Sequence, residues 1–170
     1  MRTFGTCISV VAISTAAASF SLSMDVRAAA AQWGLNGTYR ATSNGEWSKT
    51  NEIYHDEANA WSIWTISTQC SYPGECAGTV TSDARWSAPI YQKSGVWYVK
   101  RKIDNWEPCP DGTFGAGLQV YRFAATTVDG SASDPNSPIL TGEDQTVGQS
   151  GACGINKPLF ISMPFKLVKN

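Results

Sequence analysis

The stretch Trp61–Asp83, WSIWTISTQCSYPGECAGTVTSD, decides the fold. Two arms rich in Thr, Trp, Ile and Val flank the turn SYPGE, and such arms favour extended strands. Pro73 fixes φ and Gly74 accepts a positive φ, as a tight turn requires. The stretch therefore predicts a β-hairpin whose two arms end in Cys70 and Cys76.

The two cysteines also predict the register of this hairpin. A disulfide between them would place Ile66 opposite Val80. It would also place Trp64 opposite Ser82. Since side chains alternate along a strand, Trp64, Ile66 and Val80 then share one face with the cysteines. This agreement favours the local bridge over the alternative, in which each cysteine pairs elsewhere in the chain.

Met1–Ala30 predicts a secretory signal peptide. The segment has an early charge at Arg2, an apolar run from Phe4 to about Leu22, and small residues at its end. A membrane anchor is the weaker alternative, because serines and threonines interrupt the run and a spanning helix needs about 20 mostly apolar residues. Cys7 lies inside this segment and is expected to be removed with it.

The remaining segment, 31–170, has the size of a single secreted domain. Cleavage would remove Arg2, Arg27 and Asp25, which changes the formal net charge from −1 to −2. Because there is no basic excess, we expect no binding of nucleic acid. No second long apolar run follows, so we expect no stable membrane span after cleavage and a secreted or cell-envelope-associated protein.

Four of the five cysteines lie in this segment: Cys70, Cys76, Cys109 and Cys153. An even number after a signal peptide predicts two disulfides formed in an oxidising compartment. The hairpin register favours Cys70–Cys76 together with Cys109–Cys153, and other pairings stay open. A zinc site built from the four is an alternative, but the short spacing usual between paired zinc ligands is missing.

Short strand-like segments separated by turns follow one another along 31–170, with no convincing amphipathic helix. Their number is about eight, which predicts an all-β fold, either an antiparallel β-barrel or a β-sandwich. The predicted strands are Thr38–Ser43, Trp47–Tyr54, Trp61–Thr68, Ala77–Asp83, a weak Pro89–Gln92, Val96–Ile103, Leu118–Ala125, short segments at Ile139–Thr141 and Gln145–Val147, and Leu159–Val168.

Three features predict local detail. Asn44-Gly45 is a strong signal for a tight turn, so the first two strands should form a hairpin. Pro164 in the last strand cannot donate to a sheet, which predicts an edge or a bulge there. Asp104–Gly117, DNWEPCPDGTFGAG, is rich in turn residues and is expected to be a loop.

No set of residues has the pattern of a catalytic, metal or cofactor site. The single histidine, His55, lies in the polar segment HDEAN and fits a solvated loop. The order of His55, Asp104 or Asp111, and Ser150 matches one protease triad. However, Gln149 stands where such proteases normally have Asp, and no pair of carboxylates stands out for glycoside hydrolysis. We therefore predict no catalytic residue, no metal ligand and no cofactor.

The seven tryptophans are the most unusual feature of the composition. Trp64 and Trp97 fit the core of a small β-domain, where each would bury a large apolar area. Trp86 and Trp106 lie near turns, and Phe114 belongs to the same predicted loop as Trp106. These three aromatic residues are therefore the candidates for ligand binding.

A family resemblance rests on four runs: Gly37–Gly45 (GTYRATSNG), Cys70–Val80 (C-x5-C-x-G-T-V), Trp106–Gly112 (WEPCPDG) and Ser150–Gly154 (SGACG). Together they resemble small exported mycobacterial proteins of unassigned function. More loosely, Gly-Thr-Tyr followed by a cysteine-bracketed hairpin is similar to extracytoplasmic sensor-type domains of actinobacterial Ser/Thr kinases. The resemblance implies export and paired cysteines, and it brings no catalytic residue to this chain.

These features predict an exported, non-catalytic binding domain for an apolar or glycan ligand of the cell envelope. The ligand would lie in a barrel mouth or on an aromatic face. Two alternatives stay open. Exposed Trp86 and Trp106 without a cavity would favour a cell-surface protein-interaction module, and two carboxyl groups converging in a cleft would favour a secreted hydrolase.

Overall fold

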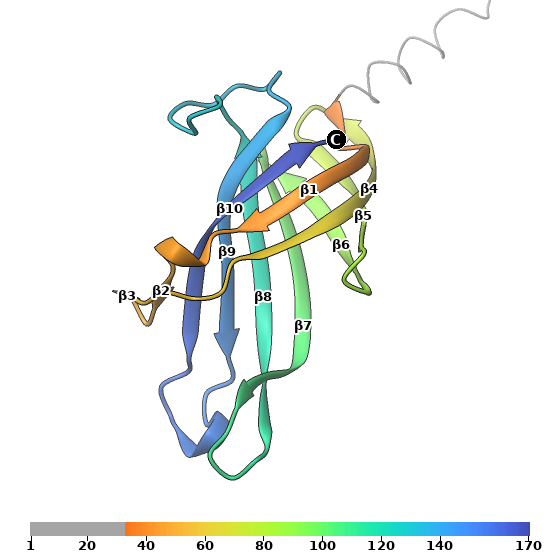
Figure 1. The fold of residues 1–170 in the computed structure, drawn as a ribbon. Helices are drawn as coiled ribbons and strands as arrows, with labels where there is room; N and C mark the ends of the chain where they lie inside the picture. Colours follow the sequence, from red (N-terminus) through yellow and green to blue (C-terminus); the bar gives the residue numbers. More distant parts are fainter. Residues whose placement is uncertain (1–32) are drawn as a thin grey trace, which may run out of the picture.

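The computed structural model describes residues 33–170, so the predicted signal peptide lies outside the described residues. One antiparallel sheet closes on itself as an eight-stranded barrel, and two short strands extend it on the outside (Figure 1). The strands are β1 (Gly37–Ser43), β2 (Lys49–Thr50), β3 (Ile53–Tyr54), β4 (Ala60–Tyr72), β5 (Glu75–Ser82), β6 (Trp86–Lys93), β7 (Val96–Pro108), β8 (Phe114–Ala125), β9 (Ile139–Gly148) and β10 (Phe160–Lys169).

The barrel order is β1-β4-β5-β6-β7-β8-β9-β10, and β10 pairs back to β1 to close it. The closing register runs from Tyr39 opposite Lys169 to Ser43 opposite Phe165. β2 pairs with the first half of β10, and β3 pairs with β2, so this small hairpin lies outside the closed ring. The predicted all-β antiparallel fold is confirmed, and of the two predicted architectures the chain adopts the barrel.

The β4–β5 hairpin, which contains most of Trp61–Asp83, has the predicted register. Cys70 pairs with Cys76, Ile66 with Val80, and Trp64 with Ser82. Closing the sheet turns the cysteine-bearing face inward, and Trp64, Ile66 and Val80 are almost completely buried.

Aromatic rings fill the centre of the barrel. Trp64 packs edge-on against Tyr121, with ring centroids 4.9 Å apart, and lies 5.4 Å from Phe165. Trp97 is 3% exposed. The prediction that Trp64 and Trp97 fill the core is therefore confirmed. A packed interior is expected for eight strands, because a barrel of this size leaves just enough room for side chains.

Both predicted disulfides are present, Cys70–Cys76 and Cys109–Cys153. The first closes the β4–β5 hairpin. The second ties the β7–β8 turn to the short 3-10 helix η2 (Ala152–Gly154) at the opposite end of the barrel (Figure 1). Zinc binding by the four cysteines is excluded by this pairing, because disulfide sulfurs are not thiolate ligands.

The predicted hairpin at Asn44-Gly45 is wrong. Asn44 instead caps the 3-10 helix η1 (Gly45–Trp47), and its side chain accepts a hydrogen bond from the Glu46 amide. A Cβ on Gly45 would lie 2.1 Å from the Glu57 carbonyl oxygen, so glycine is needed here for close backbone contact. The segment predicted as one strand, Trp47–Tyr54, contains the end of η1 and the β2–β3 hairpin.

Other strands are longer than predicted. The weak Pro89–Gln92 belongs to an eight-residue β6, and the two short segments after residue 138 form one continuous β9. Most of the predicted loop Asp104–Gly117 is strand. The pairing of β7 with β8 shifts register between Ile103 and Glu107, where the ladder is irregular. Pro164 lies where β10 passes from β1 to β2, and its carbonyl accepts from the Asn44 amide. Its missing N–H therefore faces the gap between these two partner strands. β10 is an interior strand that pairs with β9 without a register shift, so the predicted edge or bulge at Pro164 is wrong.

Candidate functional site

One end of the barrel, called the mouth here, carries a cavity. The chain enters β1 there, β10 ends there, and the β4–β5, β6–β7 and β8–β9 connections turn there (Figure 1). The cavity has a volume of about 660 Å³. It is lined by Trp33, Gly34, Leu35, Tyr39, Pro73, Gly74, Gln92, Gly95, Trp97, Ala124, Ala125, Ser133, Pro135, Asn136, Ser137, Pro138, Leu140 and Lys169.

The floor of the mouth cavity is the top of the core. Tyr39, Trp97 and Leu140 are buried and present their upper surfaces to the cavity. Burial raises the pKa of the Tyr39 phenol above its ordinary value, against the opposing effect of its bond to a backbone carbonyl. The phenol therefore stays protonated and donates to the Asn36 carbonyl. The floor is thus uncharged and largely aromatic.

The segment before β1 forms one wall of the cavity and is fixed to β4. The Thr68 hydroxyl donates to the Leu35 carbonyl over 3.0 Å, and the Thr68 amide donates to the Asn36 side chain over 2.8 Å. Gly34 allows this approach, because a Cβ there would lie 2.6 Å from the Thr68 hydroxyl oxygen. Trp33 and Leu35 consequently sit over the mouth as part of the fold.

Gln92 lines the mouth cavity with an unsatisfied polar atom. Ala88 and Ile90 precede it on the inward face of β6 and are buried in the core. The Gln92 Oε1 is buried and has no hydrogen-bond partner, alone among the buried side-chain atoms of residues 33–170. Gln92 lies between the mouth cavity and the neighbouring hollow over the Cys70–Cys76 bridge, and it lines both.

A second, shallower hollow lies beside the mouth, over the Cys70–Cys76 bridge. It has a volume of about 830 Å³ and is lined by residues of the β4–β5 and β6–β7 turns, with Tyr91, Gln92 and the bridge itself. It is larger but more open to solvent than the mouth cavity. A ligand there would bury little of its surface, so the mouth cavity is the better candidate site.

A chain of polar side chains crosses the barrel at the level of the core farthest from the mouth. The Ser43 hydroxyl and the Gln119 amide donate to the two oxygens of Asp144, over 2.7 and 2.8 Å. Arg101 Nε donates to the Gln119 oxygen over 2.6 Å, and its guanidinium lies 4.5 Å from the Trp86 ring centroid.

Burial raises the pKa of the Asp144 carboxyl, and the two hydrogen bonds and the Arg101 charge oppose that shift. Burial also raises the pKa of the neighbouring Tyr121, and the Asp144 charge adds to the rise. Both oxygens of Asp144 have partners within the barrel. This chain therefore ties β1, β7, β8 and β9 together, and it offers no free acceptor to a ligand.

The three ligand-binding candidates predicted from sequence lie away from the mouth cavity. Trp86 begins β6 at the far end of that strand and stacks on Tyr121. Trp106 belongs to β7 and is half-buried. Its ring lies over the inward face of β8, where a Cβ on Gly117 would come within 2.8 Å of it. Phe114 is exposed at the start of β8. None of the three belongs to the lining of the mouth cavity.

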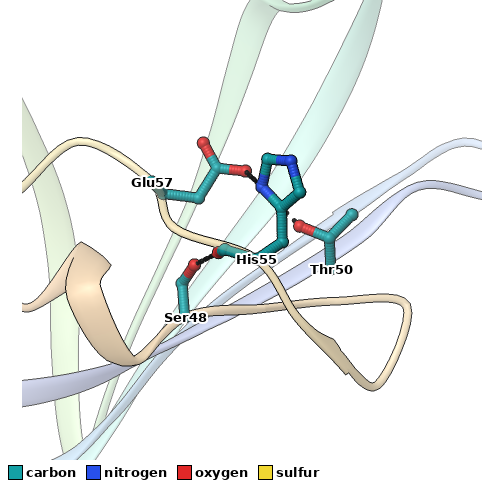
Figure 2. A network of polar contacts seen from close by, with 4 residues as sticks. All are labelled: Ser48, Thr50, His55 and Glu57. Carbon is teal, nitrogen blue, oxygen red and sulfur yellow. Dashed lines mark hydrogen bonds and ion pairs between the residues drawn. The ribbon is translucent and has the colours of Figure 1, made fainter.

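Figure 2 shows the surroundings of the single histidine. His55 Nδ1 lies 3.3 Å from Glu57 Oε1, and the Thr50 hydroxyl donates weakly to the same carboxylate oxygen. The buried Ser48 hydroxyl donates to the backbone carbonyl of His55, away from the imidazole ring. A nucleophile activated by histidine must contact the ring itself, so this network is not a catalytic triad.

The other predicted exclusions concern Ser150, metal sites and membrane helices. The Ser150 hydroxyl donates to the Asn156 carbonyl over 2.8 Å, and no hydrogen bond joins it to His55 within residues 33–170. The described chain holds no group of three or more His, Cys, Asp or Glu side chains placed to hold a metal ion. Its helices are also too short and polar to span a bilayer.

Comparison with solved structures finds a similar fold. The monomer form of the PknI sensor domain from Mycobacterium tuberculosis matches with a TM-score of 0.56 and 16% sequence identity. The match covers 80% of this chain and 87% of the PknI domain chain. No protein-family model matches the chain, and no curated protein matches it. The likeness shows a shared fold, and it agrees in that respect with the looser resemblance to sensor-type domains of Ser/Thr kinases.

Proposed function

We propose that this chain is an exported, sensor-type binding domain that holds an apolar ligand in its mouth cavity and carries out no catalysis. The observation that carries the proposal is the cavity itself, with its aromatic floor. Its volume of about 660 Å³ lies within the range of small-molecule sites. Its floor is apolar, and polar side chains such as Ser133, Asn136 and Ser137 line the cavity above it.

Export is supported by three features. The two disulfides are expected to form and persist in an oxidising compartment. The predicted signal peptide and the fold shared with the PknI sensor domain point to the same location. A binding role within the envelope or outside the cell is consistent with all three.

The cavity favours this function over the two alternatives. A hydrolase would need carboxyl groups in the cleft, and no Asp or Glu belongs to the cavity lining. A protein-interaction module was expected to expose Trp86 and Trp106 without a cavity, whereas both are half-buried and a cavity is present.

The test uses the fluorescent apolar probe N-phenyl-1-naphthylamine, whose emission rises on entering an apolar site, together with native mass spectrometry of gently purified protein. Ala125 lines the cavity at the end of β8, so Ala125→Phe should fill it and weaken probe binding roughly tenfold or more. Ala60→Phe is the matched control, because Ala60 is exposed at the start of β4, far from the mouth.

Circular dichroism and thermal unfolding of both variants confirm that they are folded. Equal probe binding by wild type and Ala125→Phe would place the probe elsewhere and contradict the proposal. So would the absence of any probe binding or co-purified ligand in the wild-type protein.

A further inference from the structure

We infer that the ligand of the mouth cavity is an anionic amphiphile, whose acyl or other apolar body lies on the aromatic floor and whose negative headgroup contacts Lys169. This inference rests on the proposed function and names the chemical class of its ligand. It follows from the charge of the cavity lining, from the inward-facing side chains of β10, and from the lack of a carboxylate partner for the Lys169 ammonium within residues 33–170.

The lining of the mouth cavity carries positive charge only. Lys169 is the sole charged side chain among its lining residues, and the lining contains no carboxylate. Tyr39, the other titratable residue of the lining, stays neutral because burial raises the pKa of its phenol. A cavity whose single charged group is a cation attracts an anion and disfavours a cation.

Lys169 belongs to the inward-facing series of β10. Phe165 and Leu167, four and two residues earlier, are 3% and 0% exposed in the core. Because side chains alternate along a strand, Lys169 continues this series at the point where the barrel opens. Lys166 and the other residues between them face outward. A charged residue in the inward series is therefore directed toward the mouth.

The backbone of Lys169 is held on both sides. It lies opposite Tyr39 of β1, and its amide donates to the Pro138 carbonyl at the end of the β8–β9 loop. The Lys169 ammonium lies 6.0 Å from the centroid of the Tyr39 ring. Figure 1 shows the end of β10 beside the start of β1 at this end of the barrel. The ammonium is thus positioned at the rim, directly above the aromatic floor.

The Lys169 ammonium has no carboxylate partner. The ion pairs found within residues 33–170 are His55–Glu57 and Lys102–Asp104. An anionic headgroup at the rim would be the first opposite charge that this ammonium meets.

The test compares two lysophospholipids that share one saturated acyl chain and differ in headgroup charge. Lysophosphatidylglycerol is anionic and lysophosphatidylcholine is zwitterionic, and both carry a hydroxyl. Each is titrated below its critical micelle concentration, by displacement of N-phenyl-1-naphthylamine. Wild type should bind the anionic lipid roughly tenfold more tightly, which corresponds to about 1.4 kcal/mol and is typical of one charge-assisted contact.

Lys169→Met should remove this preference, which is measured within each variant as the ratio of its affinities for the two lipids. Lys166→Met removes the same charge from the outer face of the same strand and should keep the preference. Equal binding of both lipids by wild type would overturn the inference, as would a preference that survives in Lys169→Met, and the proposed function would stand in either case. If neither lipid nor the probe binds, the proposed function itself fails.

Discussion

Replacing Gly117 by alanine tests how Trp106 lies on the sheet. Gly117 faces inward on β8, and a Cβ built there would lie 2.8 Å from Trp106 Cδ2, 2.9 Å from Trp106 Cε3 and 2.9 Å from Thr146 Cγ2. Carbon atoms in proteins approach comfortably to about 3.5 Å, so the indole must shift or tilt off the sheet. Overpacking of this kind costs about 1–3 kcal/mol in the free energy of unfolding.

A double-mutant cycle with Trp106→Ala separates the ring contact from other effects of the new methyl group. Without the indole, Gly117→Ala retains one close contact, to the methyl group of Thr146, and its cost should fall by about 1 kcal/mol or more. The control is Gly115→Ala, two residues earlier on the same face, where the closest side-chain atom is Ala152 Cβ at 3.1 Å. Its cost should not depend on Trp106.

The measurement is urea unfolding followed by far-UV circular dichroism, which does not depend on the tryptophan that is removed. The reasoning would be refuted if Gly117→Ala cost less than about 0.5 kcal/mol, the usual effect of a neutral surface change. It would also be refuted by an equal cost in both backgrounds, because Trp106 would then not lie over Gly117.

Two further predictions concern stability. Replacing Cys109 and Cys153 by alanine should cost about 4 kcal/mol, because the bridge closes a sequence separation of 44, whereas the separation of 6 between Cys70 and Cys76 gives about 2 kcal/mol. Urea unfolding of the two double variants checks the order, and a larger loss for the short bridge would contradict it. Burial raises the pKa of Asp144, so its stabilising contribution is present below the ordinary value of 3.8 and is lost as the pH rises through the raised pKa. Asp144→Asn should therefore be more stable than wild type at pH 7 and similar to it near pH 3.8, and a difference in melting temperature that does not vary with pH would count against this account.

The register of the β4–β5 hairpin was predictable because two independent constraints coincide in it. The alternation of Trp64, Ile66 and Val80 selects one face, and the disulfide fixes which residues are opposite. A slip by one residue would turn this whole face outward. Where no such covalent constraint existed, as at Asn44-Gly45, a local turn signal gave the wrong pairing.

Glycine was the main source of error elsewhere. At Gly45 the sequence signal was read as conformational freedom in a turn, but the residue is needed because another backbone segment lies against it. At Gly117 and Gly115 glycines were read as loop residues, although they lie in β8 and make room for Trp106 and η2. Glycine marks close approach as well as turns, and one sequence does not distinguish the two.

A barrel mouth was among the predicted places for a ligand, but its lining residues were not predicted, because aromatic residues near turns were taken as the main signal for binding. A more informative signal is a polar residue that continues an inward-facing apolar series at the end of a strand. On β6 the series Ala88, Ile90 ends in Gln92, and on β10 the series Phe165, Leu167 ends in Lys169.

Burying such a residue in the core without a partner costs free energy, so the end of the strand, where the barrel opens, is the favoured place for it. Both strands run toward the same end of the barrel, which places the two polar groups around one opening. Strand alternation alone would have marked both positions as inward-facing. Their convergence on one cavity required the strand order, and that order is set by closure of the sheet between β1 and β10.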